Sequence, residues 1–222
     1  MTRPGSRPLL LGHRGARALK SIPENTLASF DRALADGCDG FEFDVRLTAD
    51  GHPVVCHDPR TGNIAIARAS SAQLSTLPQL RDVLARYQER AFLDIELKVA
   101  GVEKIVLDLL QKHPPSRGFV VSSFLPQVLC ELHSLASTVP LGLICENKAQ
   151  LRWWSELPIE CVIPHHKLVD ATLLRELKAA RKKVLVWTVN APADMRSLAK
   201  SEVDGIISDD TSLLCRTLAA LE

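Results

Sequence analysis

The stretch PLLLGHRGARALKSIPENTLASFDRALADGCDGFEFDVRL, residues 8–47, contains one strand–helix–strand unit. Its first apolar run occupies 8–12, and a second run, GFEFDVRL, occupies 40–47. Between them, residues 25–36 have the spacing of an amphipathic helix. Near-continuous apolar runs separated by helices are typical of parallel strands that are covered on both faces. This unit therefore favours a parallel α/β fold.

The alternation of strand and helix repeats along the rest of the chain. Further strands are expected at 91–98, 118–123, 140–145, 160–164, 183–189 and 204–208. Further helices are expected near 78–90, 102–112, 126–136, 148–156, 170–181, 192–200 and 211–221. Eight strands, each followed by a helix, predict a (β/α)8 TIM barrel that forms a single domain over residues 1–222. The alternative is an open doubly wound sheet, but the loop after the first strand lacks the GxGxxG spacing common in such sheets.

One segment does not fit the eightfold repeat. A second apolar run, at 53–56, follows the second strand too closely for a parallel crossover. The intervening Asp50-Gly51 pair is a two-residue hairpin signal. We therefore expect a small antiparallel hairpin after the second strand. Centring its turn on 50–51 pairs Asp44 with His57 and would place these two side chains side by side.

Composition and charge exclude several classes of protein. The chain has 222 residues, of which 46% are hydrophobic and 24% are charged, as in an ordinary globular domain. A net charge of +1 gives no electrostatic case for binding nucleic acid or an anionic membrane. Six cysteines without a CxxC pair are expected to be buried thiols in a reducing compartment. No apolar run is long enough for a signal peptide or a transmembrane segment, so a cytoplasmic location is expected.

Three carboxylates are expected to meet at one end of the barrel. Chemistry in such barrels lies at the C-terminal ends of the strands. Glu42 and Asp44 share one face of the second strand, and Glu96 lies on the third. Hard oxygen ligands suit Mg²⁺ or Ca²⁺ better than zinc. The alternative is that the three carboxylates form salt bridges with Arg14 and Lys98.

Two histidines flank this predicted cluster. His13 follows the first strand and His57 follows the hairpin. Because imidazole titrates near neutral pH, the pair can serve as a general acid and a general base. Arg14 and Lys98 supply positive charge that suits phosphate oxygens. This set favours phosphoryl chemistry over acyl transfer, since neither GxSxG nor HExxH occurs in the chain.

The other polar candidates have less defined roles. Asn25 precedes an amphipathic run and is expected to be the N-cap of the first helix, while Glu24 either orients the nearby arginine or faces solvent. Trp187 is a packing residue or a platform for the organic part of a substrate. His165 and His166 end the sixth strand, where one of them could contact substrate.

The ordered motifs HRG, PENT, ExD, DG and HD within residues 13–58 resemble the N-terminal signature of the glycerophosphodiester phosphodiesterase family. DIELK at 94–98, VVSSF at 120–124, VWTVN at 186–190 and DGIISD at 204–209 are similar to its later strands, so the resemblance spans nearly the whole chain. It implies a TIM barrel that uses a divalent cation, Mg²⁺ or Ca²⁺, to hydrolyse glycerophosphodiesters to sn-glycerol 3-phosphate and an alcohol.

The resemblance also implies roles for site residues. The metal ligands would be Glu42, Asp44 and Glu96, the acid–base pair His13 and His57, and the phosphate contacts Arg14 and Lys98. Trp187 is expected to contact substrate because of its position at the end of a strand, and not because of the resemblance. A route through a cyclic phosphate, formed by the substrate's own hydroxyl, is compatible with it. Residues 59–76 form a shorter insertion than many relatives carry. A related barrel enzyme that cleaves lysophospholipids or another phosphodiester is therefore an alternative. A second alternative is a catalytically silent binding protein on the same barrel.

Overall fold

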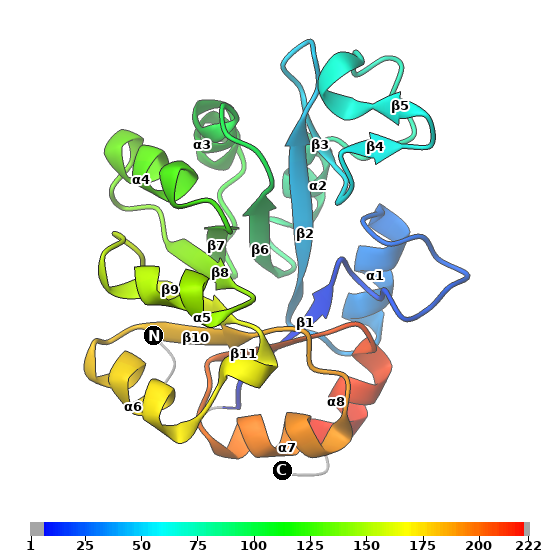
Figure 1. Ribbon diagram of the computed structural model, residues 1–222. Helices are drawn as coiled ribbons and strands as arrows, with labels where there is room; N and C mark the ends of the chain where they lie inside the picture. The colour runs from blue at the N-terminus through cyan, green and yellow to red at the C-terminus, as the bar shows by residue number, and fades with distance from the viewer. Residues whose placement is uncertain (1–6, 220–222) are drawn as a thin grey trace.

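A computed structural model describes residues 7–219, in which eight parallel strands form a closed barrel (Figure 1). The strands are β1 (Leu9–His13), β2 (Gly40–Leu47), β6 (Phe92–Leu97), β7 (Phe119–Ser123), β8 (Leu141–Cys145), β9 (Cys161–Pro164), β10 (Lys183–Val186) and β11 (Gly205–Ser208). Strand β1 pairs with both β2 and β11, which closes the barrel. The predicted TIM barrel is therefore confirmed, with each strand close to its expected range.

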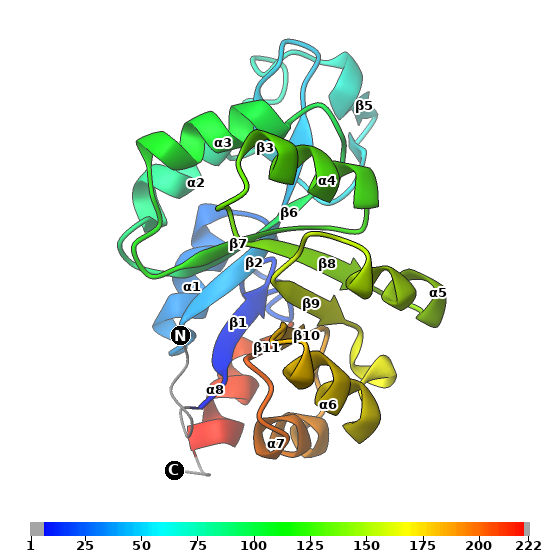
Figure 2. The same ribbon diagram turned by 90° about the vertical axis from the view of Figure 1, so that its left-hand side faces the viewer.

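Helices follow the barrel strands and cover the outside of the barrel (Figure 2). They are α1 (Leu27–Ala35), α2 (Leu80–Tyr87), α3 (Glu103–Lys112), α4 (Pro126–Leu135), α5 (Lys148–Leu151), α6 (Ala171–Ala179), α7 (Pro192–Lys200) and α8 (Thr211–Ala219). The helix expected at 148–156 is shorter than predicted, because α5 continues as a 3-10 turn over Arg152–Ser155. The expected end of the last helix, 220–221, lies outside the described residues.

Apolar side chains pack in two layers, one outside the strands and one inside them. The outer layer includes Phe30 of α1, which stacks on Phe41 of β2 at a ring distance of 4.2 Å. The inner layer contains Leu11, Ile163 and Ile207, all at most 1% exposed. Because these side chains fill the interior, the polar residues of the same strands are concentrated toward one end of the barrel.

The predicted hairpin forms, but its register differs from the prediction by one residue. Strand β3 (Pro53–Val55) runs antiparallel to the end of β2, and Val45 pairs with Val55. The loop contains three residues rather than two, because the Thr48 N–H donates to the carbonyl of His52 at 3.1 Å. Gly51 has a φ of 78° and ends this loop. A three-residue hairpin with a left-handed glycine is the next commonest solution after the two-residue turn.

His57 therefore does not lie opposite Asp44 in the ladder, and that prediction is wrong. The residue opposite is Cys56, whose N–H donates to the carbonyl of Asp44 at 3.0 Å. The regular strand ends at Val55, and the chain bends over 57–59. Arg46 holds the bend, because its Nε donates to the carbonyl of His57 at 2.8 Å. The bend, and not strand pairing, determines where His57 lies.

A small extension follows the hairpin and was not predicted. It contains β4 (Arg60–Thr61), β5 (Ile64–Ala65) and a 3-10 turn at Ile66–Arg68, packed on an apolar cluster of its own. Figure 1 shows it standing beyond the end of β2.

Two sequence expectations concern the environment of the chain. The cysteines are free, as expected, but Cys130 is exposed, so the expectation of buried thiols holds for only some of them. Over residues 7–219, no helix is long and apolar enough to cross a membrane.

Candidate active site

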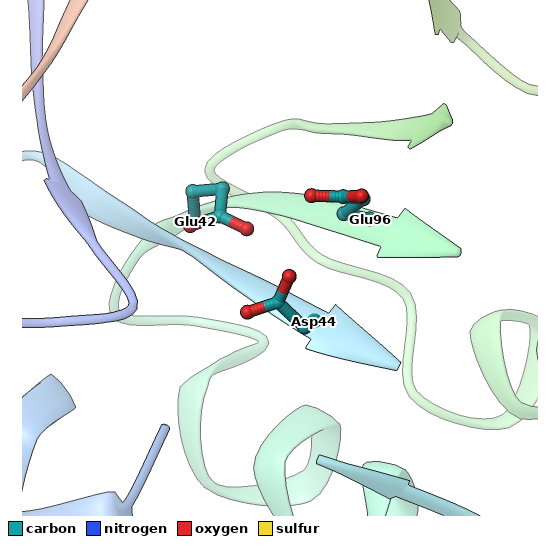
Figure 3. A group of neighbouring side chains, drawn as sticks. All are labelled: Glu42, Asp44 and Glu96. Atoms are coloured by element: carbon teal, nitrogen blue, oxygen red, sulfur yellow. The ribbon is translucent and has the colours of Figure 1, made fainter. Parts of the chain in front are cut away.

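Glu42, Asp44 and Glu96 converge inside the barrel, as predicted. Asp44 and Glu96 are register partners on β2 and β6, and Glu42 lies two residues earlier on the same face of β2. One carboxylate oxygen of each lies within 4.8 Å of the others (Figure 3). All three side chains are buried, and Asp44 is fully inaccessible. Parallel pairing therefore brings together residues that are about fifty positions apart in the chain.

Burial and mutual repulsion change the pKa values of these carboxyls. Burial, followed by the charge of Asp44, raises the pKa of Glu42 and raises the pKa of Glu96 to about 8. Burial alone would also raise the pKa of Asp44. The charges of Lys98 and Arg14 outweigh that effect, and the pKa of Asp44 is lowered. Without further positive charge, the cluster thus holds protons at neutral pH.

The salt bridges considered from the sequence form, but they leave oxygen atoms unsatisfied. Lys98 Nζ lies 2.6 Å from Glu96 Oε1 and 3.3 Å from Asp44 Oδ1. Arg14 Nε lies 3.3 Å from Asp44 Oδ2. Among the described residues, Glu42 Oε1 is buried and has no hydrogen-bond partner. Two cations do not neutralise three carboxylates, and an unpaired hard oxygen in such a group fits a divalent cation.

Asn25 belongs to this cluster, and its prediction as the N-cap of α1 is wrong. Thr26 is the N-cap, since its hydroxyl accepts from the Ser29 N–H at 3.2 Å. Asn25 instead has a φ of 58°, in the left-handed region that asparagine tolerates better than most residues. Its Nδ2 donates to Asp44 Oδ2 at 2.8 Å, and its Oδ1 accepts from the Asp44 N–H at 3.3 Å. The PENT turn thus fixes the orientation of a carboxylate.

The turn after β1 positions Arg14. Its backbone has a φ of 52°, which is uncommon for a residue with a side chain. This conformation lets its N–H donate to Glu42 Oε2 at 3.0 Å. The guanidinium is held from the other side by Glu24, whose Oε1 accepts from Nη1 at 2.7 Å. Of the two roles considered for Glu24, the structure supports the orienting one.

His13 lies at the edge of the carboxylate cluster and is supported by a residue that the sequence analysis missed. Its Nδ1 lies 2.7 Å from Asp209 Oδ1, while its Nε2 is 3.8 Å from Glu42 Oε2. Burial lowers the pKa of His13, although Asp209 acts in the opposite direction. Asp209 directly follows β11, and Asn190 and Arg17 also donate to it. A carboxylate just beyond the last barrel strand was the signal that could have identified it.

His57 lines the same cavity as His13, although by a different route from the one predicted. Its Nδ1 lies 2.8 Å from Asp58 Oδ1. Each histidine therefore has a carboxylate at Nδ1, which accepts the Nδ1 proton and leaves Nε2 available. The cavity has a volume of about 320 Å³, and Arg14 and Lys98 line it as well. Two supported imidazoles on one cavity can serve as a proton donor and a proton acceptor.

An apolar wall completes the cavity. Trp187 and Phe124 meet edge to face at 5.6 Å, and the indole Nε1 donates to the carbonyl of Ile163 at 2.9 Å. Trp187 is therefore both a packed residue and a surface that a substrate can touch. His165 packs on the edge of Trp187. Neither His165 nor His166 is among the described residues that line the cavity.

A sequence model of the glycerophosphoryl diester phosphodiesterase family matches residues 13–93 and 66–213. The chain belongs to this family. A glycerophosphodiester phosphodiesterase from Caldanaerobacter subterraneus is 30% identical, over 94% of this chain and 96% of that protein. The family resemblance and the class of enzyme predicted from the motifs are therefore confirmed.

Solved structures agree with this assignment. A putative glycerophosphoryl diester phosphodiesterase from Silicibacter pomeroyi superposes with a TM-score of 0.89 at 25% identity, covering 98% of this chain and 95% of that chain. A phosphodiesterase from Oleispira antarctica, solved in complex with the product sn-glycerol-3-phosphate, has a TM-score of 0.84 at 25% identity. That match covers 96% of this chain and 97% of the other.

The buried carboxyls predict an unusual dependence of stability on pH. Burial raises the pKa of Asp94 to about 7, above the value of about 3.9 expected in an unfolded chain. Between these values the folded state binds more protons, so lowering the pH stabilises it. In a chelating buffer, Asp94 alone should add about 1.4 kcal/mol of stability between pH 8 and pH 6. Denaturant unfolding at both pH values measures this.

The matched variants are Asp94→Asn, which cannot titrate, and Asp82→Asn, which changes an exposed carboxyl. The first should reduce the gain in stability on acidification, and the second should leave it unchanged. An Asp94→Asn protein with the wild-type pH dependence would show that Asp94 is ionised throughout this range.

Proposed function

We propose that this chain hydrolyses glycerophosphodiesters to sn-glycerol 3-phosphate and an alcohol, with His13 and His57 as the acid–base pair. The observation that carries the proposal is the arrangement around one cavity: two carboxylate-supported histidines, two basic side chains and three converging carboxylates. The Oleispira antarctica relative, which binds sn-glycerol-3-phosphate, supports this choice of product.

Glu42, Asp44 and Glu96 are proposed to hold a divalent cation, either Mg²⁺ or Ca²⁺. Their oxygens suit both ions, and Glu42 Oε1 is buried without a hydrogen-bond partner among the described residues. When bound, the cation would supply positive charge that stabilises the charge developing on the phosphoryl oxygens. Asn25 keeps Asp44 oriented for this role, and the Arg14 N–H does the same for Glu42.

Arg14 and Lys98 are proposed to bind the phosphoryl group. Both line the cavity, and both are held by carboxylates that fix their position. Coulombic attraction to these partners outweighs burial and raises the pKa of Lys98, so its ammonium stays charged. Fixed positive groups that need no rearrangement can stabilise a phosphoryl transition state effectively.

The attacking group is proposed to be the substrate's hydroxyl next to the phosphoester. The two serines at the end of β7 have other partners, because Ser122 Oγ donates to Asp94 and Ser123 Oγ donates to the carbonyl of Leu97. A hydroxyl held beside the phosphorus reacts as an intramolecular group, which lowers the barrier by several kcal/mol. One histidine Nε2 would accept its proton, and the other would protonate the departing alcohol.

This step forms a cyclic glycerol phosphate, in which the new P–O bond replaces the bond to the alcohol. Water then opens the ring, the two histidines exchange roles, and sn-glycerol 3-phosphate leaves. Asp209 and Asp58 each stabilise the imidazolium that forms on their partner in one of the two steps.

Metal removal is predicted to abolish turnover of glycerophosphocholine, and added Mg²⁺ or Ca²⁺ is predicted to restore it. Glu96→Gln should lose cation binding measured by calorimetry. Asn25→Ala should weaken cation binding about 10–100-fold, because it removes a side chain that orients the ligand Asp44 but is not itself a ligand. Glu131→Gln, on the exposed face of α4, is the matched control. Full activity in excess chelator would contradict the proposed role of the three carboxylates.

His13→Ala and His57→Ala are each predicted to lower kcat by about 10²–10⁴-fold, the usual contribution of a general acid or base. The double variant should lose less than the product of the two, because both groups serve one reaction. A substrate with a p-nitrophenol leaving group needs no acid in the first step. When the first, single-turnover release of p-nitrophenolate is measured, this substrate should rescue only the variant that lacks the first-step acid, which assigns the two roles.

His52→Ala is the control for these variants, since His52 is exposed at the hairpin tip. Circular dichroism should show each variant folded. Near-normal turnover by folded His57→Ala would remove His57 from the mechanism.

Replacing the hydroxyl next to the phosphoester by hydrogen is predicted to give a compound that binds but does not react. The reason is that the proposed nucleophile is absent while the phosphate contacts remain. Binding is measured by calorimetry and turnover by release of the alcohol. Hydrolysis at a rate comparable to that of glycerophosphocholine would mean that water attacks phosphorus directly, and the cyclic phosphate would be excluded.

A further inference from the structure

Asp94 is a buried carboxyl in the cavity that the proposed mechanism does not use. It lies on β6, on the same face as Glu96 and two residues deeper in the barrel. Its register partners are Glu42 on β2 and Val120 on β7. The side chain is fully inaccessible, yet it lines the cavity that also contains His13. Asp94 is therefore a buried group in the wall of the same cavity as the acid–base pair.

Only half of the Asp94 carboxyl is satisfied. Ser122 Oγ donates to Oδ1 at 2.6 Å. Among the described residues, Oδ2 is buried and has no hydrogen-bond partner. A buried polar atom without a partner is costly and rare in folded proteins. Asp94 is not one of the three carboxylates whose oxygens converge, so the proposed cation does not account for Oδ2.

The surroundings of Asp94 distinguish it from the phosphate-binding groups. Ile144, Ile163 and Ile207 line the same cavity and belong to the apolar cluster inside the barrel. Arg14 lies at the end of β1 and contacts the carboxylate cluster instead. The cavity thus has aliphatic walls and a buried Asp94 oxygen without a hydrogen-bond partner, which suit a short carbon chain that carries a hydroxyl.

We propose that Asp94 binds the terminal hydroxyl of the substrate's glycerol unit and thereby selects diesters in which this hydroxyl is free. The inference rests on the proposed function, in which the other glycerol hydroxyl attacks phosphorus. With phosphate at Arg14 and Lys98, the glycerol carbons point inward along the isoleucines. The leaving alcohol then points outward, toward Trp187 and the exposed Glu146.

This orientation separates two classes of substrate that the sequence left open. In a lysophospholipid acylated at the terminal position, that hydroxyl is an ester and cannot donate to Asp94. Its acyl chain would also have to enter the inner end of the cavity, where buried side chains from the barrel strands close the space. The chain is therefore a glycerophosphodiesterase that rejects such lysophospholipids.

The experiment compares two pairs of ligands in wild type and two variants. The first ligand pair is glycerophosphocholine and its analogue with hydrogen in place of the terminal hydroxyl, compared by kcat/KM. The second pair is sn-glycerol 3-phosphate and propane-1,2-diol phosphate, compared by calorimetric binding. Wild type should prefer the hydroxyl-bearing member of each pair by about 10–100-fold, as expected for a buried hydrogen bond.

Asp94→Ala should lose most of this preference, because it weakens only the hydroxyl-bearing ligands. Asp82→Ala, in an exposed position, should keep the preference. Wild type without a preference, an Asp94→Ala protein that retains it, or equal turnover of lysophosphatidylcholine and glycerophosphocholine would each overturn the proposal. Wild type that binds sn-glycerol 3-phosphate with the expected preference but does not cleave glycerophosphocholine would support the Asp94 site and overturn the proposed function.

Discussion

The burial of three carboxylates on two adjacent strands is the main constraint on this molecule. Ionised groups in such a position are stable only if other charges compensate them. Lys98 and Arg14 supply part of that charge. Burial and the negative charge that these two residues do not compensate raise the pKa values of Glu42 and Glu96. The site therefore favours either protons or a cation.

Much of the loop structure around the barrel serves to hold this group in place. Arg14 and Asn25 both adopt left-handed backbone conformations, and each contacts one of the carboxylates directly. Asp209 orients His13 from the opposite end of the chain. Uncommon backbone conformations persist where the surrounding structure fixes them, and such positions are often functional. Arg14 and Asn25 both lie in the loop after β1, beside the site.

The hairpin and the first helix both differ from their predicted form by one residue. The Asp50-Gly51 pair correctly indicated a hairpin, but the loop took in one more residue, which shifted the register. His57 still lines the cavity, because a bend after the strand redirects its side chain. Asparagine is a preferred N-cap residue, and yet Thr26, the residue after Asn25, caps the helix. Local rules cannot distinguish between neighbouring polar residues that could fill the same role.

The sequence by itself determined the barrel, the two strands that carry the carboxylates, and the convergence of Glu42, Asp44 and Glu96. These follow from the periodicity of apolar residues and from the parity of side chains along a strand. Only the tertiary structure decided which hydrogen bonds support the site. His13 pairs with Asp209 because closure of the barrel brings β1 beside β11. Asp94 has an unpartnered oxygen because its side chain is buried inside the barrel. Residues so far apart in the chain become neighbours through packing, which no local pattern encodes.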